Sequence, residues 1–527
     1  MKKNESGDFF MEIKSETSYN KNSRCADVYA ESRADYSLPD YLGEVRKILF
    51  SSAALRPSGR FSGGDDIEFS GVVVYSIVYL DMENKLCSVE FTSDYDYSVK
   101  CSADKYRDSV SDTRISAYSI RLCGPRKLSA RASLVGSVRL CETASISIGG
   151  NAIDDAPEVC TKRIRVHDSA MSVVVEREYA EEIAKLDGAI SDEIDVVYCS
   201  AEPVVDSVEW DGEVINVKGR LCMWAVIQNG DAPAYRQEKI INIDESISSE
   251  GLDADMKLGG ELTVVSLKNS VNATENGCDL VICAVVEIGV VGECNRTVDV
   301  VTDAYLRNCK TDNSYATIDY VSFADSVSVR GNHNAEFDRS ELESDGINDL
   351  IFLDAVARID RIDRDQNSAI VVGEIRYSGI ASEILDDKIS YVGIKFTSPI
   401  AINVNTSCQI DEKTQFEAKI LTSSVSVNLD ANKIYAACCT DCILKVCQPM
   451  QQVVLSSFVK NESEACEPMG SKITVYYPDE CETLFSVAKR YRTSSFKLMN
   501  DNDIADTVFS SDNENRDLAG IKKLLIY

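Results

Sequence analysis

The sequence predicts a mainly β protein, in which three tandem β-sandwich-like repeats are followed by a small βααβ domain. Three observations predict this fold class. Hairpin turns recur at matching positions in three long segments, a glycine marks the second strand of each segment, and only residues 471–527 alternate between strand and helix patterns. At 527 residues, with 44% hydrophobic and 27% charged residues, the chain has the composition of a globular protein with several cores.

Each predicted repeat begins with an apolar strand, a polar break and a second strand that carries a glycine. The first strands start at Ile48, Val196 and Ile351. The marker glycines are Gly71, Gly219 and Gly373, which stand 148 and 154 residues apart. The distance from strand start to glycine is 23, 23 and 22 residues, so the spacing is nearly constant. The breaks between these strands lie at residues 62–66, 211–212 and 365–367.

Two further turns follow the glycine in every segment. The second turns lie at residues 83–84, 229–230 and 386–387, and the third turns at 124–125, 276–277 and 430–432. Several contain Asn-Gly or Asp-Gly, which favour tight hairpins because the central residues of a type I′ turn need positive φ. We therefore expect an N-terminal segment (1–23) and three β domains spanning residues 24–160, 161–310 and 311–467.

The start of the first repeat carries a more specific signal. Pro39-Asp40 forms a turn after an extended lead-in, and Lys47-Ile48-Leu49 then enters the first strand. Repeated β domains with this entrance, followed by a small terminal module, resemble the SPOCS-domain proteins of the bacterial spore envelope. The resemblance covers almost the whole chain. It implies a non-enzymatic morphogenetic protein without a cofactor, which links the ATPase that coats the forespore surface to the layers assembled on it.

The tail, residues 471–527, has the pattern strand, helix, helix, strand. Alternation predicts a strand over Ile473–Tyr477, and helical spacing of apolar residues predicts a helix over Thr483–Tyr491. Ser494 or Ser495 is suited to cap a second short helix that ends near Met499. Residues 524–526 supply a closing strand.

This tail resembles a LysM module. The segment from Cys481 to Tyr491 is similar to the LysM pattern Gly-Asp-Thr-Leu-Trp-x-Ile-Ala-x-x-Tyr, and Asn502 stands where the module usually has an asparagine. Cys481 replaces the glycine, Glu482 the aspartate and Phe485 the tryptophan, and Asp501 takes a position that is usually apolar. Glycan-binding LysM modules hold N-acetylated sugars between two loops, whereas the resemblance to spore proteins implies a protein partner.

The candidate partner-binding residues lie in the two loops that correspond to this groove. They are Asp479, Glu480, Cys481, Glu482 and Thr483 in the first loop, and Asn500, Asp501 and Asn502 in the second. The expected partner is the spore-envelope morphogenetic ATPase or another coat protein. The alternatives are that each residue is only a solvated loop residue, or that the tail binds a cell-wall glycan such as peptidoglycan or chitin.

Charge is distributed unevenly along the chain. The net charge is −31, yet residues 471–527 contain 8 Lys/Arg and 9 Asp/Glu, so almost all of the excess lies upstream. Such a surface repels a phosphate backbone, which excludes nucleic acid as a partner. The acidity is explained either by solubility or by attraction to a basic partner. Exposed edge strands also leave self-association open.

No segment of the sequence predicts export or membrane insertion. The N-terminus lacks the apolar run of a signal peptide, and the longest apolar stretch, Leu280–Val291, is interrupted by Glu287. We therefore expect a protein that is not membrane-embedded and stays in the cytoplasm. The SPOCS resemblance implies the mother cell, at the forespore surface.

Metal and catalytic signals are weak. The 19 cysteines lack zinc-like spacing. In the densest group, residues 438–447, neighbouring cysteines would point to opposite faces of a strand. We therefore expect reduced, half-buried thiols rather than a metal site or a regulated thiol. Residues 363–374 have the oxygen spacing of a calcium loop, but Ser368 takes the position of its glycine and we expect a hairpin. His167 and His333 lie near no nucleophile in sequence, and we expect solvated or turn positions. No catalytic residue or metal ligand is predicted, although an enzyme with carboxylates in a cleft between repeats remains a rival.

Overall fold

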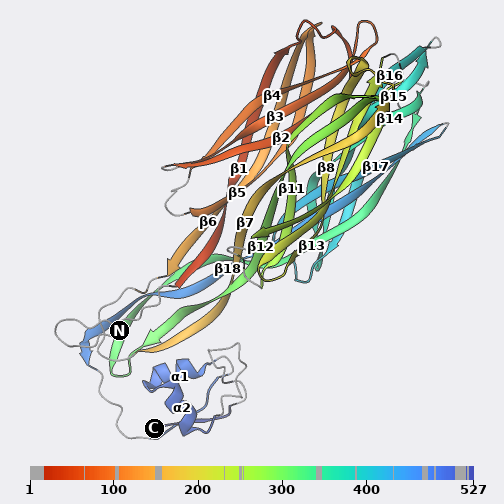
Figure 1. Cartoon of the computed structure of the whole chain (residues 1–527). Coiled ribbons are helices and arrows are strands. Elements are labelled where there is room, and N and C mark those ends of the chain that lie inside the picture. The colour runs from red at the N-terminus through yellow and green to blue at the C-terminus, as the bar shows by residue number, and fades with distance from the viewer. Residues whose placement is uncertain are drawn as a thin grey trace.

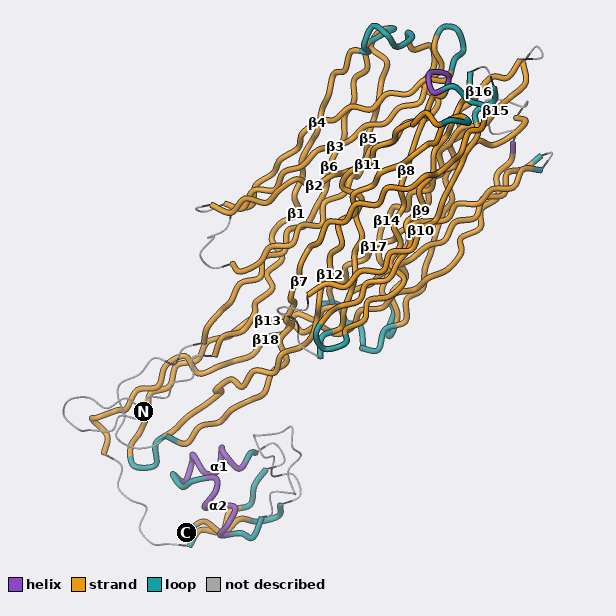
Figure 2. Tube along the Cα trace, viewed as in Figure 1, coloured by secondary structure: helices purple, strands orange, loops and turns teal. Residues whose placement is uncertain are grey.

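The computed structural model describes residues 17–63, 66–100, 106–146, 148, 157–230, 232–248, 252, 255–339, 347–385, 388–430, 432–465, 473–479, 482–504, 518 and 521–527. Most of them lie in long antiparallel strands, and the two α-helices are confined to the tail (Figures 1 and 2). The prediction of a mainly β protein is therefore confirmed.

The body consists of three successive sets of six strands. The first set is β1 (Thr17–Ser37), β2 (Val45–Gly63), β3 (Asp66–Asp81), β4 (Leu86–Lys100), β5 (Tyr106–Gly124) and β6 (Lys127–Ile146). The second is β7 (Glu158–Asp187), β8 (Ile194–Trp210), β9 (Val214–Asn229), β10 (Tyr235–Ser248), β11 (Lys257–Thr274) and β12 (Gly277–Tyr305). The third is β13 (Cys309–Asp338), β14 (Ile347–Arg364), β15 (Ser368–Leu385), β16 (Lys388–Asn405), β17 (Gln415–Leu429) and β18 (Lys433–Ala465).

Strand order is the same in all three sets. In each, the first, sixth and fifth strands form one sheet and the second, third and fourth strands form another: β1-β6-β5 with β2-β3-β4, β7-β12-β11 with β8-β9-β10, and β13-β18-β17 with β14-β15-β16. The two sheets of a set share one core, as when Tyr75 of β3 packs with Ala132 and Leu134 of β6. The expected limits at residues 160 and 310 fall within the first residues of β7 and β13.

The described hairpin turns lie where the sequence predicts them, whereas residues 64–65, 386–387 and 431 of the predicted turns lie outside the described residues. Asp211 N–H donates to the carbonyl of Val214 at 3.2 Å, and Asp365 N–H donates to that of Ser368 at 2.9 Å. The segment with calcium-loop spacing is thus the turn between β14 and β15, as expected from its alignment with the other repeats. Asn84 and Gly230, in two of the second turns, have φ of 67° and 53°, the left-handed region that asparagine and glycine tolerate.

The marker glycines lie opposite a β-bulge in the preceding strand. Gly71 pairs with Pro57, Gly219 with Val205 and Gly373 with Ile359, and in each case the register shifts immediately after the paired residue. A Cβ on any of these glycines would clash with a carbonyl oxygen of the bulged strand. The oxygens belong to Arg56, Val204 and Arg358, and each would lie no more than 2.7 Å from the added Cβ. Glycine recurs because the bulged backbone leaves no room for a side chain.

Another bulge lies nearer the start of β2, β8 and β14, at an equivalent position in the three sets. The register shifts between Ile48 and Phe50 in β2, between Val196 and Tyr198 in β8, and between Leu350 and Phe352 in β14. Leu350, and not Ile351, is therefore the counterpart of Ile48 and Val196. With this correction the distance to the marker glycine is 23 residues in every set.

Phe50, Tyr198 and Phe352, each at the end of such a bulge, meet in one core between the three sets. Their ring centroids lie 5.2 Å (Phe50–Tyr198), 5.0 Å (Phe50–Phe352) and 5.6 Å (Tyr198–Phe352) apart. Trp224 of β9 joins them and is 1% exposed, while Trp210 lies at the rim of the second core. We call this core the hub. Val78, Val226 and Ile380, each seven residues after a marker glycine, also belong to it.

The longest strands continue beyond the sheets and form a stalk. Three ribbons contribute to it, namely β1–β6, β7–β12 and β13–β18, and their first strands β1, β7 and β13 contact one another. Its core contains Ile146 of β6, Val166 of β7, Val300 of β12, Tyr320 of β13 and Val454 of β18. In Figure 1 the ribbons run from the body toward the tail, which lies at the end of the molecule.

The hub also contains a carboxylate whose charge is unfavourable there. Burial, together with the nearby Glu202 carboxylate, raises the pKa of Asp354 to about 6, although Ala355 N–H donates to its Oδ1 at 2.8 Å. Burial also raises the pKa of Glu202, which accepts a hydrogen bond from Trp224 Nε1 at 2.9 Å. Arg236, stacked on the Trp224 ring at 4.4 Å, opposes both shifts.

Replacing a marker glycine is expected to destabilise the body. Gly373→Ala places a methyl group against the Arg358 carbonyl and should reduce the free energy of unfolding by about 2–3 kcal/mol, because backbone must move. Gly331→Ala in β13 is the matched control, since a Cβ there meets nothing within 4 Å. Urea denaturation followed by circular dichroism measures both. Equal midpoints for the two variants would contradict the role assigned to the bulge.

Asp354→Asn is expected to stabilise the protein in a pH-dependent way. Because the folded pKa of about 6 exceeds the ordinary value of 3.8, ionisation at neutral pH opposes folding by on the order of 2–3 kcal/mol. Stability of the wild type therefore falls as pH rises from about 4 through 6, and the gain from Asn should appear above pH 6 and vanish near pH 4. Denaturation midpoints at pH 4.5 and 8 test this, and a gain that is independent of pH would be inconsistent with it.

Candidate functional site

The tail folds as a compact βααβ unit. Its elements are β19 (Thr474–Tyr476), α1 (Leu484–Tyr491), α2 (Ser495–Asp501) and β20 (Leu524–Ile526), with β19 antiparallel to β20. The predicted strands and helices are confirmed to within a few residues. The core that the helices and sheet share contains Leu484, Val487, Ala488, Leu498, Met499, Leu524 and Ile526.

Thr483, one of the candidate residues, begins α1. Its hydroxyl accepts from Ser486 N–H at 3.1 Å, and Thr483 N–H donates to the Ser486 hydroxyl at 3.1 Å, so the pair forms a reciprocal cap. The helix ends at Arg492, which has a left-handed φ of 53°. Ser494 caps α2 by accepting from Lys497 N–H at 3.0 Å, as the sequence predicts.

Glu482 is held by groups of the tail itself. Its carboxylate accepts from the Tyr476 hydroxyl at 2.6 Å, from Arg490 Nη2 at 2.6 Å and from Asp479 N–H at 3.2 Å. The Tyr476 hydroxyl and the Arg490 guanidinium hold the pKa of Glu482 below its usual range. The carboxylate therefore stays ionised and fixes the first loop to β19 and α1. Asp479 is exposed, and Glu480 and Cys481 lie outside the described residues.

Asn502 has a similar internal role in the second loop. Its Nδ2 donates to the carbonyls of Leu498 and Leu525, each at 2.8 Å, and its Oδ1 accepts from Leu525 N–H at 2.6 Å. This side chain connects the end of α2 to β20. Asn500 is exposed and Asp501 is half-buried at the end of α2. Within the described part of the tail, no hydrogen bond or ion pair joins the two loops, although both flank the β19–β20 sheet.

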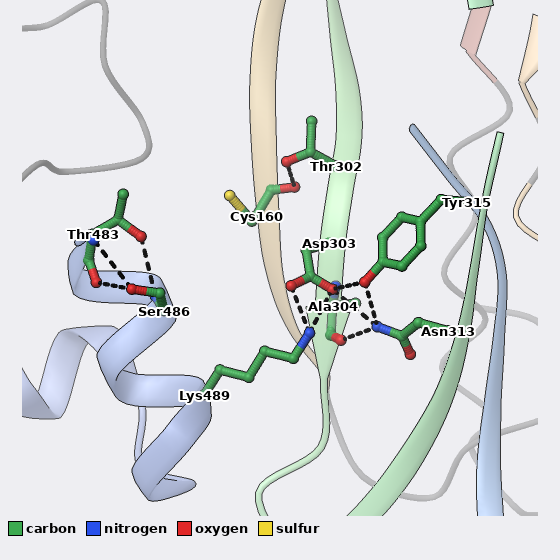
Figure 3. A network of polar contacts seen from close by, with 9 residues as sticks. All are labelled: Cys160, Thr302, Asp303, Ala304, Asn313, Tyr315, Thr483, Ser486 and Lys489. Atoms are coloured by element: carbon green, nitrogen blue, oxygen red, sulfur yellow. Dashed lines mark hydrogen bonds and ion pairs between the residues drawn. The ribbon is translucent and has the colours of Figure 1, made fainter. Parts of the chain in front are cut away.

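The tail is also attached to the stalk, through residues that the sequence did not single out. Asp303, at a bulge in β12, accepts from Lys489 Nζ of α1 at 2.8 Å (Oδ1) and 2.6 Å (Oδ2). Its Oδ1 also accepts from Asn313 Nδ2 and from the Tyr315 hydroxyl, each at 2.9 Å (Figure 3). The Asp303 carboxylate thus joins α1 to both β12 and β13.

Tyr305, the last residue of β12, completes this junction. Its hydroxyl donates to the carbonyl of Thr493 at 2.6 Å, and its ring belongs to the core of the tail. Phe485 of α1 packs edge-to-face on this ring, with ring centroids 5.2 Å apart. The tail follows β18 in sequence but contacts the end of β12 instead. The one sequence signal near Lys489 is the basic last turn of α1, and basic residues there ordinarily interact with the helix dipole.

Neither histidine lies in solvent or in a turn, the positions predicted from the sequence; both lie in strands. His167 is 2% exposed in β7 and stacks on Phe323 of β13, with ring centroids 5.4 Å apart. Glu293 of β12 lies 4.0 Å from His167 Nε2 and pairs with Lys445 Nζ of β18 at 2.9 Å. His333, in β13, shares a hydrogen bond of 2.9 Å with the Ser398 hydroxyl, and burial lowers its pKa. The prediction was wrong because polar residues beside His167 masked a strand buried between two sets.

The dense cysteine group lies in β18. Cys438 and Cys442 are 2% and 0% exposed, whereas Cys439 and Cys447 are half-buried on the other face. This is the alternation that the sequence predicts for a strand. Among the described residues, no group of three or more His, Cys, Asp or Glu side chains is placed to hold a metal ion.

Comparisons with known proteins give no relative to which the site can be referred. No protein-family model matches the chain, and no curated protein or solved structure shows significant similarity to it. Within the part of the chain that the structure describes, no helix has the length and apolar character needed to cross a membrane.

Lys489→Met is expected to loosen the tail from the stalk. The variant keeps the methylene packing of α1 but removes the ammonium group that faces Asp303, an interaction between half-buried groups worth about 1–2 kcal/mol. Amide hydrogen exchange over residues 484–493 should become roughly tenfold faster, as measured by mass spectrometry. Lys497→Met, on the exposed side of α2, serves as the control. Unchanged exchange in Lys489→Met would show that the ion pair does not hold the junction.

Proposed function

We propose that this chain is a non-enzymatic assembly protein of the spore coat and cortex, of the SPOCS type, with a LysM-like tail that docks a partner at the forespore surface. In this proposal the three six-strand sets are copies of one domain. The observation that carries it is the recurrence of one strand order, with the same bulges and glycines, in all three sets before a βααβ tail.

The proposed role of the body is to present the tail in a fixed orientation. The hub unites the three sets at their second sheets, and the stalk unites their first and sixth strands. Asp303 and Tyr305 then anchor α1 to the end of the stalk. A partner bound to the tail would accordingly be held at a defined distance from any layer that contacts the body.

The proposed partner is the ATPase that coats the forespore surface. We expect the full chain to co-purify with the tagged ATPase encoded in the same genome when the two are produced together. Retention of the chain on purified peptidoglycan or chitin oligomers is the matched measurement for the alternative, a glycan-binding LysM protein. Glycan retention without co-purification would replace this proposal by that alternative.

Localisation provides an independent test in cells. A fluorescent fusion of the full chain is expected to appear only during sporulation, in the cytoplasm of the mother cell, and to surround the forespore. A fusion that is produced in vegetative cells, or that is spread evenly through the cytoplasm during sporulation, would contradict the proposed role.

A further inference from the structure

One face of the β19–β20 sheet remains apolar and exposed. In the ladder, Thr474 pairs with Ile526 and Tyr476 with Leu524, and Leu524 and Ile526 belong to the tail core. Because side chains alternate between faces, Val475 and Leu525 point to the opposite side. Ile473, Tyr477, Lys523 and Tyr527 immediately flank the two strands. We call the surface formed by these six residues the outer face.

The exposure of this face is large for such a small module. Ile473 is 66% exposed, Val475 50%, Tyr477 70% and Tyr527 55%. Exposed apolar residues that occur singly need no explanation, whereas a contiguous group usually marks a binding surface. Sequence alternation placed the strand correctly but gave no reason for apolar residues on both of its faces.

Two other described surfaces of the tail are already in use. The side of α1 that carries Phe485 and Lys489 packs on the stalk. Glu482, Thr483 and Asn502 of the predicted groove hold the tail together through their own hydrogen bonds. Phe496 of α2 is also strongly exposed (72%), but it is a single apolar side chain, whereas the outer face gathers several. The tail that carries this face lies at the end of the molecule (Figure 1).

The charges around this face define the chemistry of its partner. Lys522 and Lys523, both exposed, immediately precede β20, and Lys497 Nζ reaches the Tyr527 carbonyl at 3.4 Å. Asp479 is the exposed carboxylate that follows Tyr477. This basic border contrasts with a chain whose net charge is −31, so a second copy would bring two strongly acidic bodies together.

We propose that the outer face of the β19–β20 sheet, rather than the loop groove, is the docking surface of the tail, and that it receives a protein element with an apolar ridge bordered by carboxylates. This inference rests on the proposed function, because it assigns the surface through which the forespore partner binds. Apolar contact supplies the affinity, and the lysines orient the acidic partner.

Binding of purified full-length protein to the ATPase, measured by biolayer interferometry, tests the inference. Tyr477→Ala is expected to weaken binding about tenfold or more, as truncation of a central aromatic contact does. The double variant Lys522→Glu, Lys523→Glu should weaken binding most at low salt, where charge interactions are least screened. Tyr41→Ala, which removes an equally accessible tyrosine of the body (85% exposed), is the control and should bind as the wild type does.

The outcomes separate this inference from the proposed function. If the wild type does not bind the ATPase, the proposed partner is wrong and the inference falls with it. If the wild type binds and Tyr477→Ala binds equally well, the partner stands and the assigned surface is wrong. Sedimentation of the wild type and of Tyr477→Ala, each without the ATPase, detects self-association. A wild-type dimer that is dissociated by Tyr477→Ala would assign the face to a second copy instead. Hydrogen exchange over α1 confirms that each variant keeps its fold.

Discussion

The close approach of a bulged strand to a glycine is the constraint on which the rest of the body depends. The second strands share two bulges at equivalent positions, and Gly71, Gly219 and Gly373 allow the neighbouring strand to follow the bend without a side chain in the way. The bend aims Phe50, Tyr198 and Phe352 at one another. Without it, the three sets would be joined by the stalk but not by a core between their second sheets.

The hub and the stalk constrain the three sets at separate places, so the body resists both bending and rotation of one set against another. The sets are nevertheless not interchangeable. Trp224 enlarges the hub from the second set, and Asp354 introduces a carboxylate from the third, where the first two sets have Ser52 and Ser200. These differences concentrate at the hub, where a charge or a large ring affects all three sets at once.

The strands, turns and tail helices could be predicted because their signals are local: alternation, Asn-Gly turns, marker glycines and a capping serine lie within a few residues of the structure they specify. The hub and stalk could not, because they join residues more than a hundred positions apart. The junction of Lys489 with Asp303 spans 186 residues, and nothing near either residue announces it. The prediction for His167 was wrong for the same reason, because the Phe323 ring on which it stacks is distant in sequence. Of the candidate site, the sequence located the two loops, but it could not show that Glu482, Thr483 and Asn502 serve the fold of the tail.

The fusion of three similar sets in one chain has a consequence for valency. A homotrimer built from single sets would end in three equivalent modules, related by symmetry and able to crosslink whatever they bind. Here the sole tail is seated on β12, although it follows β18, and the other two ribbons carry no counterpart among the described residues. Three similar sets thus share one body, and that body carries one described tail. In the proposed role, each chain would therefore bring one docking module to its partner rather than three.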